Sequence, residues 1–122
     1  MIKILLVEDE PIFANLIKNE IKKERVTILW AENIAEAEEY FSQNPDISLI
    51  IMDANVPNKL NAIPLIKEIR KTFNGPIIAF SSYAHYNDIL FESGCDYKLL
   101  KDANGIRIEL WKLIKDTLSL SD

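Results

Sequence analysis

Side chains that could bind a metal ion or act in catalysis directly follow short apolar runs in this chain. Glu8 and Asp9 follow the run IKILLV, and Asp53 follows the run SLIIM. Two carboxylates about 4 Å apart repel each other by roughly 4 kcal/mol at an effective dielectric constant near 20. A cluster of all three would therefore need a cation or a raised pKa. Oxygen ligands without histidine or cysteine suit a hard divalent ion, and a partly hydrated site suits Mg²⁺.

A hydroxyl group and an ammonium group follow two further runs. Ser81 comes directly after IIAF, and Lys101 follows the run that ends at residue 100. With Mg²⁺ held nearby, Lys101 could balance one phosphoryl oxygen and Ser81 could donate a hydrogen bond to another. Asp53 would then be the candidate nucleophile, since a carboxylate can form an acyl phosphate. Each residue alone is more simply a turn, cap or surface residue, and it is their convergence at four strand ends that favours a site.

The elements that must position these residues alternate regularly. Runs of strand length occupy residues 2–7, 26–31, 48–52, 77–80 and 96–100, and helical patterns begin at Pro11 and cover 34–42, 62–73, 84–92 and 105–119. Strands that are apolar on both faces need helices on both sides of a parallel sheet. The sequence therefore predicts an α/β fold with a three-layer, doubly wound parallel five-stranded sheet of flavodoxin-like strand order 2-1-3-4-5. In such sheets ligands bind outside the carboxyl ends of the strands.

Local signals support several helices. Pro11 suits a first helical turn, where its missing N–H costs nothing, and Asn33 with Glu36 three residues on resembles a capping box. Apolar residues recur at helical spacing in the first, third and last helical patterns. They are Ile12, Leu16, Ile17 and Ile21, then Ile63, Ile66, Ile69 and Phe73, and finally Ile108, Trp111, Leu113, Ile114 and Leu118.

Composition limits the class of protein. With 122 residues, 48% apolar and 27% charged, the chain has the size and composition of one globular domain. We therefore expect a single domain over residues 1–122 and no output domain in this chain. A net charge of −5 disfavours nonspecific nucleic-acid binding. The single cysteine, Cys95, rules out an intrachain disulfide and a thiolate metal cluster. No run is long enough for a membrane span or a signal peptide, so we expect a cytoplasmic protein.

Four segments together resemble the receiver domain of two-component response regulators. They are LLVEDEP, LIIMDANVP, PIIAFSS and GCDYKLLK, in this order and at near-standard spacing over essentially the whole chain. The resemblance implies a protein that takes a phosphoryl group from a histidine kinase or a phosphotransfer protein. It also implies a signalling switch that depends on Mg²⁺, with only slow self-dephosphorylation as chemistry of its own.

The resemblance assigns a role to each strand-end residue. Asp53 corresponds to the phospho-acceptor, and Ser81 and Lys101 to the residues that contact the phosphoryl group. The implied metal ligands are Asp9 and Asp53 directly, Glu8 mainly through water, and the backbone carbonyl of Asn55.

Several positions depart from the family pattern. Asp102 stands where a proline with a cis bond usually follows the lysine, and Lys98 stands where strand five usually carries an aromatic residue. Ser82 replaces a small apolar residue, and the segment from Ser81 to Gly94 is about two residues short, which predicts a trimmed or irregular fourth helix. Because these departures lie on the output side, an alternative is a pseudo-receiver, a protein-interaction module that is not phosphorylated.

Two other classes of protein fit poorly. A phosphatase of the haloacid-dehalogenase type needs a second aspartate two residues after the first, and Asn55 at that position cannot supply the proton. A nucleotide- or flavin-binding module needs glycine in the first strand–helix turn, whereas the three glycines are Gly75, Gly94 and Gly105.

Overall fold

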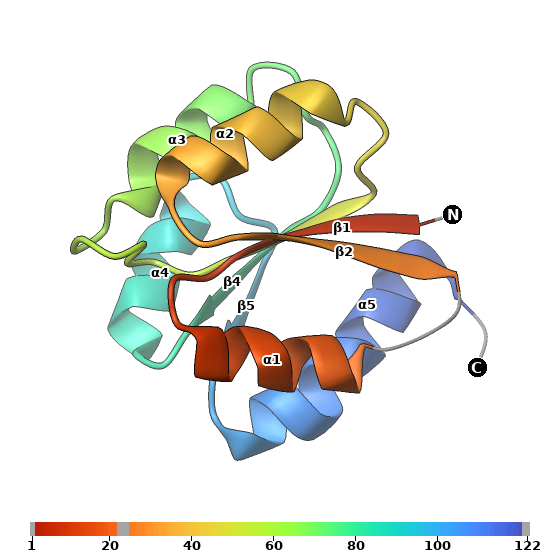
Figure 1. Ribbon diagram of the computed structural model, residues 1–122. Coiled ribbons are helices and arrows are strands. Elements are labelled where there is room, and N and C mark those ends of the chain that lie inside the picture. Colours follow the sequence, from red (N-terminus) through yellow and green to blue (C-terminus); the bar gives the residue numbers. More distant parts are fainter. Residues whose placement is uncertain (1, 22–24, 121–122) are drawn as a thin grey trace.

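The computed structural model describes residues 2–21 and 25–120 (Figure 1). Its strands are β1 (Ile2–Val7), β2 (Val26–Ala31), β3 (Leu49–Met52), β4 (Ile77–Ser81) and β5 (Tyr97–Leu100). Its α-helices are α1 (Pro11–Glu20), α2 (Ile34–Gln43), α3 (Ala62–Ile69), α4 (Ala84–Glu92) and α5 (Leu110–Leu118). The strands pair in parallel in the order β2-β1-β3-β4-β5, so the predicted topology is confirmed.

Two hydrophobic clusters lie on opposite faces of the sheet, because successive strand side chains point to opposite sides. Leu5 and Val7 of β1 face the cluster formed with α2, α3 and α4, whereas Ile4 and Leu6 face the cluster formed with α1 and α5. Figure 1 shows the helices as separate layers on either side of the sheet. β3 and β4 are buried along their whole length, as their continuous apolar runs predict.

The first helix buries fewer of its apolar residues than the sequence pattern indicates. Ile17 and Ile21 are fully buried, but Ile12 is 74% exposed and Leu16 is 41% exposed. At about 100° per residue, Ile12 lies roughly 140° around the helix from Ile17. Ala14 takes the buried position on that turn instead, so α1 presents an apolar strip to solvent.

The third helix is shorter than predicted. It ends at Ile69 and does not reach Phe73. The Arg70 guanidinium donates hydrogen bonds to the carbonyl oxygens of Phe73 and Gly75 at 3.1 and 2.6 Å, and to that of Gly94 at 2.9 Å. Two of these carbonyl groups belong to the loop that follows α3, and the third belongs to the turn that follows α4. Phe73 is still partly buried against the core.

The last helical region has the predicted extent but begins with a π-helical turn, Gly105–Glu109, before α5. Asp102 organises this start: its side chain accepts a hydrogen bond from the Gly105 N–H at 2.7 Å, and its carbonyl accepts one from the Ile106 N–H at 2.9 Å. A Cβ on Gly105 would lie 1.9 Å from the carbonyl oxygen of Leu100, so this close approach requires glycine.

The predicted start of α2 is confirmed in its main feature. The Asn33 side chain accepts a hydrogen bond from the Glu36 N–H at 2.9 Å, and the Glu36 carboxylate accepts one from the Glu32 N–H at 2.7 Å.

Within residues 2–21 and 25–120, every helix is too short or too polar to cross a membrane.

Candidate functional site

Three carboxylates meet at the carboxyl edge of the sheet, as the topology predicts. Glu8 and Asp9 follow β1, Asp53 follows β3, and one oxygen atom from each lies within 4.8 Å of the others. Glu8 and Asp53 are buried, while Asp9 is half-buried. Asp9 and Asp53 line an open pocket of about 370 Å³. Its lining residues are Asp9, Glu10, Phe13, Asp53, Asn55, Pro57, Ser81, Ser82, Tyr83 and Lys101.

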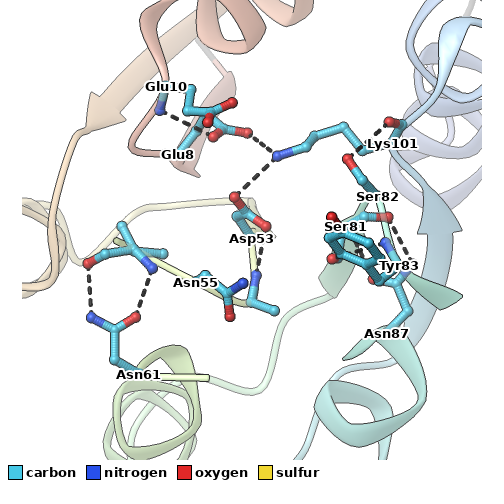
Figure 2. Close-up of polar contacts among 12 residues, drawn as sticks. Glu8, Glu10, Asp53, Asn55, Asn61, Ser81, Ser82, Tyr83, Asn87 and Lys101 are labelled. Carbon is cyan, nitrogen blue, oxygen red and sulfur yellow. Dashed lines mark hydrogen bonds and ion pairs between the residues drawn. The ribbon is translucent and has the colours of Figure 1, made fainter. Parts of the chain in front are cut away.

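Lys101 reaches into this cluster from the end of β5. Its Nζ donates hydrogen bonds to Glu8 Oε1 at 2.7 Å and to Asp53 Oδ2 at 3.0 Å (Figure 2). The ammonium group also lies 4.5 Å from the centre of the Phe13 ring, within range of a cation–π contact. Only 6% of Lys101 is exposed, so these partners stabilise a buried charge that would otherwise be costly.

The charges at the site are not balanced by Lys101 alone. Burial and, next, the nearby charge of Asp53 raise the pKa of Glu8 to about 7, although Lys101 acts in the opposite direction. Burial of Lys101 alone would lower its pKa, but the carboxylates of Asp53 and Glu8 outweigh burial and raise it. Three carboxylates against one ammonium group leave an excess of negative charge, so the site favours additional positive charge.

The donor set fits Mg²⁺. The Glu8, Asp9 and Asp53 oxygens converge without a histidine or cysteine ligand, and the neighbouring pocket is open enough for water and a phosphoryl group. Burial and then the charge of Asp53 disfavour the ionised form of Glu8, and a divalent ion bound here would favour that form. The chemistry of these residues thus agrees with the predicted metal site.

Backbone contacts hold Asp53 and its loop in place. The Ala54 N–H donates a hydrogen bond to Asp53 Oδ1 at 2.8 Å, which leaves Oδ2 facing Lys101. The side chain of Asn55 accepts a hydrogen bond from the Leu60 N–H at 2.7 Å. In the same loop, the Asn61 amide accepts from and donates to the backbone of residue 56 (Figure 2). These contacts orient the loop that carries Asn55 beside the pocket.

Trp30 and Glu10 fix the other acidic loop. The indole N–H of Trp30 donates a hydrogen bond to the Glu8 carbonyl at 2.8 Å, and the Glu10 N–H donates one to the Glu8 carboxylate at 3.2 Å. The hydrogen bond from Trp30 therefore holds the turn that presents Glu8 and Asp9.

Ser81 lies across the pocket from these acids and is 2% exposed. Its hydroxyl accepts a hydrogen bond from the Tyr83 N–H at 3.2 Å. The Asn87 side chain binds the Ser81 backbone at both its N–H and its carbonyl oxygen. Asn87 and Phe13 were not identified from the sequence, because an amide or a phenyl ring inside a helical pattern carries no local signal of a site contact.

The structure keeps two other reactive residues away from the site. His85 is exposed on α4. Cys95 is buried, and burial raises the pKa of its thiol to about 12, which agrees with a packed residue and not with a nucleophile.

Comparison with known proteins identifies the family. The family model of the response regulator receiver domain matches residues 4–110, and this chain belongs to that family. The chain is 31% identical over 121 residues to the aerobic respiration control protein ArcA of Escherichia coli, covering 96% of this chain and 50% of ArcA. It is 34% identical over 104 residues to the autoinducer 2 sensor kinase/phosphatase LuxQ of Vibrio parahaemolyticus, covering 82% of this chain and 12% of LuxQ. The chain thus spans half of ArcA and a small part of LuxQ.

Solved structures agree with this assignment. The response regulator TrrA of Thermotoga maritima, in complex with Mg(2+)-BeF, superposes with a TM-score of 0.80 at 34% identity, covering 96% of this chain and 99% of TrrA. A two-component response regulator of Clostridium difficile superposes with a TM-score of 0.85 at 24% identity, covering 98% and 97% of the two chains. The second likeness supports the fold alone.

Proposed function

We propose that residues 1–122 form a receiver domain that accepts a phosphoryl group on Asp53 and acts as a phosphorylation-controlled switch. The observation that carries this proposal is the buried contact of Lys101 Nζ with Asp53 Oδ2 at 3.0 Å, beside a pocket shared with Asp9 and Ser81. One basic group, a hydroxyl and a cluster of acids able to hold Mg²⁺, all around one open pocket, suit a phosphoryl group.

In the transfer step, a carboxylate oxygen of Asp53 forms a bond to phosphorus while the bond to the donor's imidazole nitrogen breaks. The electron pair of that bond stays on the nitrogen. Glu8, Asp9, Asp53 and the carbonyl of Asn55 would hold Mg²⁺, which neutralises charge on the phosphoryl oxygens when bound.

Lys101 and Ser81 supply contacts from this chain's own residues. On transfer, the Lys101 ammonium exchanges its contact with the Asp53 carboxylate for one with a phosphoryl oxygen. The Ser81 hydroxyl, which accepts a hydrogen bond from Tyr83, is free to donate its own proton to another phosphoryl oxygen.

The donor that we propose is a histidine kinase or a histidine phosphotransfer protein in the cytoplasm. The exposed side chains of Ile12 and Leu16 on α1 offer it an apolar contact next to the acidic pocket. A second pocket of about 390 Å³ lies between α1 and the start of the last helical region, and Phe13 lines both pockets. The likeness to part of LuxQ, which is named as a sensor kinase/phosphatase, supports the same class of partner.

Incubation with acetyl phosphate and Mg²⁺, followed by intact-mass spectrometry, tests the proposed acceptor. We expect one added phosphoryl group that hydroxylamine removes, because an acyl phosphate is labile to this nucleophile. Asp53→Asn should abolish the adduct, and Lys101→Ala should reduce it. Asp116→Asn, an equal charge change at an exposed position on α5, should leave it intact. A wild-type protein without an adduct would overturn the proposal and favour the pseudo-receiver.

A further inference from the structure

Asn87 connects three parts of the molecule through one buried side chain. It lies in the second turn of α4 and is 3% exposed. Its Oδ1 accepts a hydrogen bond from the Ser81 N–H at 2.8 Å, and its Nδ2 donates to the Ser81 carbonyl at 3.2 Å (Figure 2). The same Nδ2 donates to the Leu99 carbonyl of β5 at 2.7 Å. The amide therefore binds the ends of β4 and β5 to α4.

The side chains of β5 make a different kind of contact with α4. Lys98, at the position where an aromatic residue is usual, forms an exposed ion pair with Asp88 at 2.8 Å and lies over the Phe91 ring. Exposed ion pairs of this kind contribute little free energy. Tyr97 is 38% exposed. The buried polar connection between α4 and β5 therefore runs through Asn87.

We propose that Asn87 is a positioning residue that makes α4 and the end of β5 follow Ser81 when Ser81 engages a phosphoryl group. This inference rests on the proposed phosphorylation of Asp53. The Ser81 hydroxyl is tied to its own loop by the hydrogen bond from the Tyr83 N–H, and we infer that the Ser81 backbone moves with the hydroxyl when it reaches a phosphoryl oxygen. Because Asn87 binds the Ser81 backbone at both polar groups, α4 must either move with Ser81 or leave buried donors and acceptors unpaired, which is costly.

Amide NMR shifts with a phosphoryl analogue test this coupling. Each protein is titrated to saturation with Mg²⁺ and beryllofluoride, so that a change in affinity does not affect the comparison. The Ala54 N–H, which donates to Asp53, reports occupancy of the site. The amides of Phe91 and Leu100 report the far end of α4 and the end of β5. In the wild type we expect all three signals to shift.

In Asn87→Ala the Ala54 signal should still shift, whereas the shifts of Phe91 and Leu100 should fall by about threefold or more, because the link to Ser81 is gone. Leu90→Val is the matched control, since Leu90 is a buried residue of α4 whose side chain belongs to the apolar cluster. It should loosen the packing of α4 but keep all three responses. A merely structural role for Asn87 would make the two variants behave alike.

Asn87→Asp provides a second variant if Asn87→Ala does not fold. It keeps an oxygen for the Ser81 N–H and loses the donor to the two carbonyl groups, so the Leu100 response should fall as well. Full Phe91 and Leu100 responses in a folded Asn87 variant would overturn this inference and leave the proposed function standing. A wild-type protein whose Ala54 signal does not respond would overturn the proposed function, and the inference with it.

Discussion

Replacing Asp53 with asparagine should stabilise the metal-free protein, because it removes one charge from a crowded cluster. Oxygen atoms of Asp53, Glu8 and Asp9 lie within 4.8 Å of one another. At an effective dielectric constant near 20, Asp53 then takes part in two repulsions of about 3.5 kcal/mol each. The attraction between Asp53 and Lys101, which form an ion pair at 3.0 Å, offsets about 5.5 kcal/mol of this repulsion at the same dielectric constant. Asparagine keeps the shape and an oxygen for the Ala54 N–H, so the net gain is about 1–2 kcal/mol.

A thermal melt without divalent ions measures this gain. Near pH 8, Glu8, with a pKa of about 7, is mostly ionised and the repulsion is present. For a domain of this size, 1 kcal/mol corresponds to about 4 °C, so Asp53→Asn should melt about 4–8 °C higher than the wild type. Asp116→Asn carries the same charge change on the exposed part of α5 and should melt with the wild type.

Adding Mg²⁺ should reverse the order of stability. At 100 times Kd the ion stabilises the wild type by about 2.7 kcal/mol, and Asp53→Asn should gain little because it lacks one of the three carboxylates. A metal-free Asp53→Asn that melts below the wild type would show that the pair with Lys101 outweighs the repulsion and would refute the reasoning. Equal stabilisation of both proteins by Mg²⁺ would place the ion elsewhere.

Three further predictions concern residues near or behind the site. Tyr83 is 63% exposed and lines the pocket, so Tyr83→Ala should admit water and shorten the phosphorylated lifetime several-fold, about 1 kcal/mol in the barrier. Decay of the phosphorylated mass measures this lifetime, and an unchanged value would exclude shielding. The Cys95 thiol, with a pKa of about 12, should react with iodoacetamide near pH 8 about 10³-fold more slowly than in the unfolded chain, and equal rates would contradict its burial. Gly105→Ala should lower the melting temperature, because its Cβ would meet the Leu100 carbonyl; an unchanged melt would show that the turn can shift.

Strand positions and the edge that carries the site could be predicted from the sequence because both are local properties. A continuous apolar run between turn residues indicates a buried strand, and Asp53 is recognisable because it directly follows such a run. Lys101 follows a less apolar and more exposed strand, β5. The parallel order follows from the alternation of strands and helices. Adjacent carboxyl ends then bring together groups that are about 90 residues apart, such as Glu8 and Lys101.

Helix ends were less predictable, because they depend on contacts outside the helix. The apolar spacing of α3 continues to Phe73, but Arg70 binds carbonyl groups of two later segments and the helix ends at Ile69. In α1 the periodicity does not determine which apolar residues face the sheet, and Ile12 lies exposed while Ala14 is buried. Packing against the sheet decides between these orientations.

The residues that support the site were decided by the tertiary structure alone. In the sequence, Asn87 is indistinguishable from an ordinary helical residue. In the structure, α4 lies against the ends of β4 and β5, and the Asn87 amide binds the backbone of Ser81 and Leu99. Phe13 contacts Lys101 only because α1 and the end of β5 meet at the same edge. The chemical groups at the strand ends were predictable, because residue type and local pattern are enough to identify them. Hydrogen bonds and ring contacts between distant segments depend on three-dimensional positions, which no local pattern contains.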